Sequence, residues 1–229
     1  MLGMGTVIAI MDGPQTHQCV RALIQCARVY ATMPAYTWDS DMLTTEMCTA
    51  HTDRSVLATV CFDAEQTLEG RSMLQIQRMR RLRRAGVTTV VRGRNSGGDE
   101  AMQHTKVLVT DGKRMVAGST NWTRNSQRAT ELSILLEVSP EGRPLVEAWC
   151  TRLLSGAVPV TDAMLRAGEQ SATRFASQHD NSYRAAGQQS APVVGQAGDR
   201  ADVPASSGQA GPRDGRRLAA IYREEQRRT

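Results

Sequence analysis

The sequence predicts an α/β fold, a sandwich in which helices flank a mixed central β-sheet, followed by a disordered C-terminal tail. Strand-like apolar runs alternate with helical patterns from residue 5 to residue 155, and this alternation favours layered α/β packing. After Val160 the composition shifts to Ser, Gln, Gly, Ala and Arg. Such a segment buries too little apolar surface to offset the entropy of ordering. We therefore expect one folded domain over residues 1–160 and a disordered basic tail over residues 161–229.

The first elements follow from turn signals and apolar spacing. Residues 6–11 form a β-like run that the turn sequence Asp-Gly-Pro closes. Residues 15–27 repeat apolar side chains at helical spacing. Residues 28–37 suit a strand, and Pro34 places that strand near a sheet edge or at a bulge because proline lacks a backbone N–H.

The middle of the chain predicts a strand between two helices. Asp39 or Ser40 can cap a helix that ends near residue 50. Residues 55–62 are almost continuously apolar, as is typical of a strand buried on both faces. Residues 64–85 give the clearest helical pattern, and Gly86 suits the position just after a helix.

The second half predicts mostly strands. Asp111-Gly112 separates two apolar runs, a strong signal for a two-residue hairpin. A closing helix is expected over residues 141–154, with Leu145, Val146, Trp149 and Leu153 facing inward. The expected strands cover residues 87–91, 103–110, 113–117 and 131–138.

The charge of the chain is modest, but its distribution is not. The net charge is +5, while the segment from Arg71 to Arg94 holds eight arginines and no acidic residue. On the predicted helix Arg78, Arg81 and Arg84 fall opposite the apolar side, so we expect them to bind a polyanionic substrate. A solvated helix face is the plainer interpretation of the same pattern.

The five cysteines form no Cys-x-x-Cys pair, so neither a disulfide framework nor a zinc site is expected. We expect no metal site and no cofactor. The apolar run Val7–Met11 is far shorter than the roughly 20 residues of a membrane-spanning helix, so no transmembrane segment is expected. The chain suits a soluble protein of the cytoplasm.

Residues 104–121 carry the clearest chemical signal. They read His-Thr-Lys-Val-Leu-Val-Thr-Asp and then, after a second apolar run, Gly-Ser-Thr-Asn. Side chains alternate along a strand, so His104 and Lys106 are expected on one face. A nucleophilic imidazole beside a fixed cation suits attack on a phosphodiester, whose oxygens need neutralising in the transition state. A lone strand histidine is more often structural, and the lysine and the Gly-Ser-x-Asn sequence overturn that interpretation.

This pattern resembles the HxKxxxxD…GSxN signature of the phospholipase D superfamily, whose fold matches the predicted element order over residues 5–155. The resemblance implies that His104 attacks phosphorus and becomes a phosphohistidine. It implies that Lys106 and Asn121 contact the phosphate oxygens and that Ser119 helps to hold their loop. It also implies that Asp111 supports the motif more often than it touches substrate, and here Asp111 also begins a tight turn. Glu131 matches, by position, an acid that accepts a hydrogen bond from the imidazole.

The chain contains one such motif. His17 and His51 are not followed by lysine at the second position. The family's reaction uses two histidines, one as nucleophile and one to protonate the leaving oxygen. The chain therefore resembles the single-motif branch, which comprises bacterial nonspecific endonucleases and the Zucchini and mitochondrial cardiolipin hydrolase group. That resemblance implies a homodimer with one active site across the two-fold axis. It also implies the mitochondrial surface as an alternative to the cytoplasm for the location of the protein.

Three functions follow, in order of preference. The first is a metal-independent phosphodiesterase that cleaves nucleic acid, with single-stranded DNA or RNA as the expected substrate and the arginine helix following the backbone. The second is a phospholipid hydrolase or phosphatidyl transferase. Such an enzyme requires an apolar entrance for its lipid substrate or an amphipathic helix that binds the membrane. The third is an inactive nucleic-acid-binding module.

Overall fold

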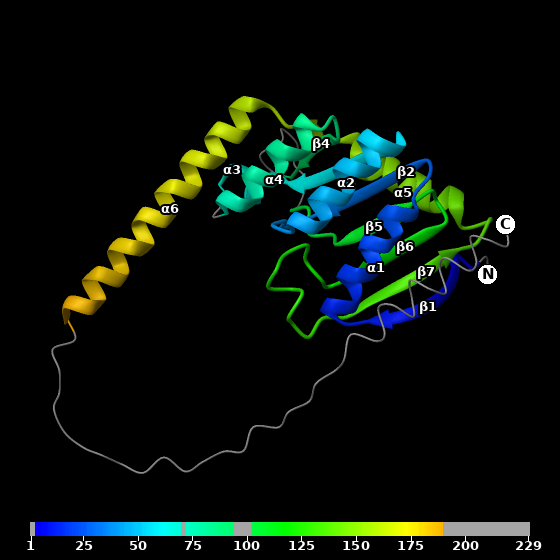
Figure 1. The fold of residues 1–229 in the computed structure, drawn as a ribbon, viewed down its shortest axis with the longest axis horizontal. Coiled ribbons are helices and arrows are strands. Elements are labelled where there is room, and N and C mark those ends of the chain that lie inside the picture. The colour runs from blue at the N-terminus through cyan, green and yellow to red at the C-terminus, as the bar shows by residue number, and fades with distance from the viewer. Residues whose placement is uncertain (1–2, 70–71, 94–101, 190–229) are drawn as a thin grey trace, which may run out of the picture. The chain divides into compact units, whose positions relative to one another are not determined.

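The protein folds around an eight-stranded mixed sheet with helices on both faces (Figure 1). The structure, a computed structural model, describes residues 3–69, 72–93 and 102–189, with side chains up to residue 178. The strands are β1 (Gly5–Met11), β2 (Tyr30–Ala35), β3 (Leu57–Asp63), β4 (Thr88–Arg92), β5 (Val107–Thr110), β6 (Arg114–Gly118), β7 (Ser133–Val138) and β8 (Val158–Pro159). The helices are α1 (Gly13–Cys26), α2 (Asp41–Arg54), α3 (Ala64–Leu68), α4 (Met73–Arg84), α5 (Arg143–Ser155) and α6 (Asp162–Gln189).

The strand order is β1-β7-β6-β5-β2-β3-β4-β8. Strands β2, β3 and β4 are parallel, and every other neighbouring pair is antiparallel. The predicted α/β class with a mixed sheet is therefore confirmed.

Local signals placed several boundaries correctly. Ser40 caps α2 by accepting a hydrogen bond from the backbone N–H of Leu43, as Ser is suited to do. Asp111 and Gly112 both have positive φ, 53° and 63°, which is the backbone of the predicted two-residue turn between β5 and β6. Gly86, with φ of 86°, ends α4.

The two faces of the sheet are covered by different helices. Val107 and Val109 of β5 pack against Val146 and Cys150 of α5. Alternation along the strand turns the intervening Leu108, which is fully buried, toward the other face. Helices α1 and α2 cover that other face (Figure 1).

Three local expectations were wrong. The strand with Pro34 is central, because β2 lies between β5 and β3, but its pairing with β5 stops at Thr32, before the proline. The helix expected over residues 64–85 is two helices, and Ser72 caps the second by accepting from the backbone N–H of Gln75. Leu145, expected inside, is 52% exposed.

Helix α6 occupies residues for which disorder was expected. Its first part belongs to the compact unit that extends to Thr173, with Leu165 and Ala172 buried. A Cβ added to Gly168 would lie 2.4 Å from the backbone oxygen of Thr67, so a glycine is needed where α6 crosses α3. The structure has a helix over Asp162–Gln189, where the sequence predicted disorder, and the rest of the predicted tail lies outside the described residues. The sequence placed the end of the folded domain at residue 160 because α6 has few large apolar residues. Its packing against α3 is a long-range contact, which the local pattern does not show.

Candidate active site

Five residues of the sequence motif, all except Asp111, lie at one end of the strands of the sheet, which we call the site edge. Strands β2 and β3 end at this edge, where Tyr36 follows β2 and Asp63 closes β3. Strand β5 begins there, β6 ends there and β7 begins there, because β5 and β7 are both antiparallel to β6. The three segments 104–106, 119–121 and 131–132 are therefore neighbours in space, although other residues separate them in the chain.

His104 and Lys106 lie just before β5, which starts at Val107 rather than at residue 103. The His104 side chain is exposed, whereas Lys106 is only 5% exposed. The Lys106 ammonium donates a hydrogen bond to the backbone oxygen of His104 at 2.6 Å. This bond uses one of its three N–H donors, which leaves two that can face anionic oxygens.

Burial of Lys106 changes its acidity. Desolvation lowers the pKa of the ammonium to about 8, and the negative charge of Glu131 opposes this shift. Removal from water disfavours the charged form because the ion loses its hydration. A bound phosphate would favour the ammonium again, so this cation is suited to an anionic ligand.

Ser119 and Glu131 hold each other at the same edge. The Ser119 hydroxyl donates to the Glu131 carboxylate, and the backbone N–H of Leu132 donates to Ser119 Oγ at 3.1 Å. Among the described residues no hydrogen bond joins Glu131 to His104. The expected role of Ser119 in holding the loop fits these contacts, while the orienting role of Glu131 stays a prediction.

Asn121 follows β6 and carries a buried polar atom. Its Oδ1 is buried and, among the residues that the structure describes, has no hydrogen-bond partner. Buried polar atoms are nearly always paired, but an amide oxygen can only accept, so a phosphate oxygen would have to be contacted through Nδ2 of Asn121. The backbone oxygen of Asn121 accepts from Nε2 of His17 at 3.0 Å. Sequence reasoning missed His17, because its partners Asn121 and Gln127 are more than a hundred residues away.

Asp111 lies at the other end of β5. Its carboxylate accepts three backbone N–H bonds, from Arg28 at 2.9 Å, Val29 at 2.8 Å and Tyr30 at 2.9 Å. Seven residues of extended chain separate it from His104, roughly 20 Å. Asp111 therefore fastens the β5–β6 hairpin to the start of β2, and its role in the reaction stays a prediction.

The structure adds residues that the motif did not reveal. Tyr36 packs its ring edge-on against His104, with ring centres 4.5 Å apart. Asp63 is fully buried and accepts from the backbone N–H of Gln103, next to His104, at 2.8 Å. Their only sequence signal was their position at the ends of two buried strands, where side chains from different strands meet.

The arginines of α4 are engaged with neighbouring helices. Arg78 and Arg81 both form ion pairs with Asp41 of α2. On the other side, Arg80 and Arg83 pair with Glu169 and Asp162 of α6. Arg84 is exposed, but it ends the helix near the sheet edge opposite the site, where β4 begins. Substrate binding by Arg78, Arg81 and Arg84 stays a prediction.

Two further classes of site were tested against the described residues. Among them, no group of three or more His, Cys, Asp or Glu side chains could hold a metal ion. None of the described helices combines the length and hydrophobicity that crossing a lipid bilayer requires.

The chain is similar to known proteins in both sequence and fold. The family described as "Cardiolipin synthase, PLD-like domain" matches residues 20–147, whereas comparison with curated protein sequences gives no match. Nuc from Salmonella typhimurium, a phospholipase D family member, superposes with a TM-score of 0.59 at 16% identity, over 69% of this chain and 99% of Nuc. NucT from Helicobacter pylori gives 0.57 at 14% identity, over 66% of this chain and 98% of NucT.

A third similar fold is phosphatidylserine synthase from Haemophilus influenzae, with a TM-score of 0.52 at 10% identity, over 72% of this chain and 43% of that chain. At these identities the structural likenesses concern the fold, while the family match extends over more than half of the sequence. The mixed sheet and the residues gathered at its edge agree with that match. The chain belongs to the phospholipase D superfamily.

Proposed function

We propose that this protein is a metal-independent phosphodiesterase that cleaves nucleic acid through a phosphohistidine on His104. The observation that carries the proposal is the pairing of an exposed imidazole with a buried ammonium two residues away, joined by the 2.6 Å bond from Lys106 to the His104 backbone. The imidazole can reach a substrate phosphorus, while the ammonium supplies fixed positive charge where charge develops.

The reaction needs two proton-transfer events. A ring nitrogen of His104 forms a bond to phosphorus as the bond to the leaving oxygen breaks, and a second imidazole gives that oxygen a proton. Water then attacks the phosphohistidine while the second imidazole takes a proton from it, which frees His104. Lys106 and the Asn121 amide hold the non-bridging oxygens in both steps.

The second imidazole comes from a second copy of the chain. The other histidines with described side chains are His17, which is buried beneath Asn121, and His51, which bonds to the backbone of Val56. A two-fold axis running parallel to β5 brings two copies of the site edge together. Antiparallel pairing through the edge strand β1 would turn the two sites to opposite ends, so β1 does not suit this dimer.

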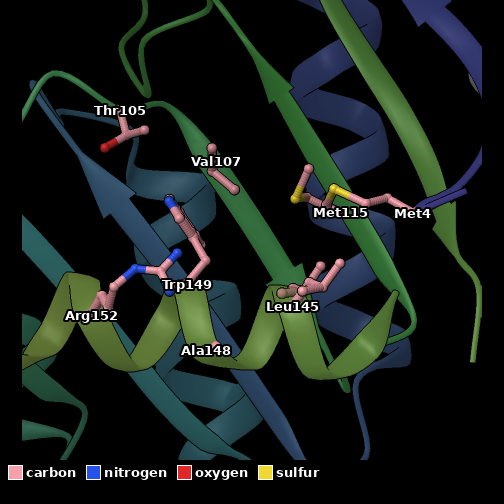
Figure 2. A pocket seen from close by; sticks show the side chains of 9 residues that line it. Met4, Thr105, Val107, Met115, Leu145, Ala148, Trp149 and Arg152 are labelled. Carbon is pink, nitrogen blue, oxygen red and sulfur yellow. The ribbon is translucent and has the colours of Figure 1, made fainter. Parts of the chain in front are cut away.

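The face of the sheet that carries α5 suits the dimer contact. A groove of about 490 Å³ lies there between α5 and the strands, lined by Met4, Thr105, Val107, Met115, Leu145, Val146, Ala148, Trp149 and Arg152 (Figure 2). Met4 and Leu145 are 46% and 52% exposed, and Thr105 is the neighbour of His104. Burying this apolar surface against its own copy would stabilise a dimer whose axis passes beside the site.

Nucleic acid is the preferred substrate because the net charge is positive and a polynucleotide is bound through its phosphates. The shortage of aromatic residues argues against extensive base stacking, so the specificity for sequence should be low. The Zucchini-like assignment within the superfamily is part of the same proposal. The groove beside Thr105 is apolar and could accept the acyl chains of a phospholipid. Phospholipid hydrolysis is therefore the second candidate.

One assay separates the candidates. Purified full-length protein and His104→Asn are incubated in EDTA with labelled single-stranded DNA, single-stranded RNA or vesicles of a diacyl phospholipid. Cleavage of a polynucleotide by the wild type alone supports the proposal. Release of a lipid headgroup alone would establish the second candidate. Binding without cleavage would leave a nucleic-acid-binding module, and turnover that EDTA abolishes and a divalent ion restores would refute the metal-independent mechanism.

A further inference from the structure

Tyr36 contacts both reactive side chains of the site. It follows the last residue of β2 and so lies at the site edge. Its ring meets the His104 imidazole edge-on, with an interplanar angle of 64°. The Lys106 ammonium lies over the same ring, 4.9 Å from its centre. One aromatic ring therefore touches the nucleophile and the cation at once.

The Tyr36 ring supplies part of the electrostatic compensation that the Lys106 ammonium needs. Lys106 is almost completely buried, and among the described residues no carboxylate lies within ion-pair distance of it. A buried charge needs compensation. The electron-rich face of an aromatic ring supplies part of it through a cation–π interaction, which strengthens when water is excluded.

The ring is itself held in place. Gln66 donates a hydrogen bond from Nε2 to the Tyr36 hydroxyl at 3.0 Å. The backbone N–H of Gln66 in turn donates to Asp63, the residue that caps α3, at 2.8 Å. The other oxygen of Asp63 accepts from Gln103, immediately before His104. A single buried carboxylate thus anchors the Tyr36 contact and the backbone of the nucleophile.

We propose that Tyr36 is a positioning residue of the reaction centre, whose ring sets the distance between His104 and Lys106 and whose hydroxyl, through Gln66 and Asp63, fixes that ring. The inference deepens the proposed function and rests on it for its kinetic consequence. Misplacing a reactive group by about 1 Å can cost on the order of 10²-fold in rate. Loss of the ring should therefore lower kcat far more than it raises KM.

Two substitutions at Tyr36 separate the ring from the hydroxyl. Tyr36→Phe keeps both ring contacts and removes only the bond to Gln66, so we expect kcat to lie between the values for the wild type and for Tyr36→Leu. Tyr36→Leu removes the ring, and we expect kcat to fall on the order of 10²-fold with KM changed little. Gln66→Ala leaves the ring present but unanchored and should give an intermediate fall.

A second readout does not need turnover. The chain has two lysines, Lys106 and Lys113, so the Cε signals of ¹³C-labelled protein report them separately, with exposed Lys113 as the internal reference. In the wild type and Tyr36→Phe, Lys106 should titrate near its pKa of about 8. In Tyr36→Leu the ammonium loses the cation–π contact but gains contact with water, and because burial is the largest cause of its lowered pKa, its titration should move toward the ordinary 10.5.

The two readouts distinguish the possible failures. A Tyr36→Leu variant that keeps both the wild-type kcat and the wild-type Lys106 titration would overturn the inference. If the wild type cleaves nothing, the proposed function fails, and the titration alone decides whether the ring shields Lys106. If Tyr36→Leu does not fold, Gln66→Ala decides, and a wild-type kcat in that folded variant would refute the anchoring of the ring.

Discussion

His17 donates a hydrogen bond from Nε2 to the backbone oxygen of Asn121 at 3.0 Å. Its other ring nitrogen lies 3.2 Å from the Gln127 amide nitrogen, which is a donor. A ring that donates at Nε2 and accepts at Nδ1 is the neutral tautomer. The neutral His17 of α1 therefore holds the loop that carries Asn121.

The stability of the protein should fall in mild acid because of His17. Burial lowers its pKa below 6.5, so the unfolded state binds the proton more tightly than the folded state. The stabilisation is complete above pH 6.5 and decreases as the pH falls from there through the folded pKa. Denaturant unfolding between about pH 5 and pH 7 checks this. His17→Gln, which keeps a donor, should flatten the dependence, and an equal loss of stability in acid for that variant would contradict the assignment.

The activity should fall at alkaline pH because of Lys106. Its ammonium, with a pKa of about 8, is the form that neutralises phosphate oxygens. The profile of kcat/KM reports groups of the free enzyme, so it should decline above about pH 8. Lys106→Arg is the matched control, because arginine stays charged to about pH 12. That variant should be slower but should keep its residual rate to higher pH, and a decline at the same pH would assign the titration to another group.

Asp111 should contribute to stability rather than to the chemical step. Asp111→Ala removes three bonds to backbone N–H groups and places alanine at a φ of 53°. We expect a decrease of about 2–4 kcal/mol in the free energy of unfolding, with kcat of the folded enzyme nearly unchanged. Asp111→Asn tolerates the positive φ and keeps one acceptor, so it should be destabilised less. A large fall in kcat with unchanged stability would place Asp111 in the reaction.

Mixed dimers test the shared site. If each reaction needs His104 of both copies, a dimer of one wild-type and one His104→Asn subunit lacks either the nucleophile or the acid, and loss of general acid–base catalysis costs about 10²–10⁴-fold. A freely exchanged equimolar mixture should then keep roughly one quarter of the wild-type activity, the fraction of wild-type homodimers. Half of the activity would mean that each subunit acts alone.

The arginine helix can be tested by salt dependence. Replacing Arg78, Arg81 and Arg84 by alanine should weaken binding to single-stranded nucleic acid and lower the log-log salt slope by about 0.7 for each phosphate that is no longer neutralised. Asp41→Asn is the control, because it frees Arg78 and Arg81 from their ion pairs and should not weaken binding. An unchanged slope in the triple variant would mean that these arginines serve only the packing of α2, α4 and α6.

The sequence determined the parts of this protein that local chemistry controls. Apolar periodicity placed most helices and strands, and Ser40, Gly86 and the Asp111-Gly112 turn marked boundaries through their own backbone preferences. The spacing of His104, Lys106, Ser119 and Asn121 predicted a cluster, because strand alternation and one hairpin suffice to bring these residues near each other.

Only the tertiary structure decided which partners those residues have. Tyr36, Asp63 and His17 reach the site from other strands and from α1, and nothing near them in the chain marks them, since their contacts join residues between 40 and 104 positions apart. The length of β5 separates Asp111 from His104 and Lys106. The arginines of α4 form ion pairs with acidic residues of α2 and α6. Long-range contacts arise from strand order and helix packing, which one-dimensional patterns do not encode. The sequence therefore pointed to the groups that we propose as catalytic, and the fold decided which residues surround them.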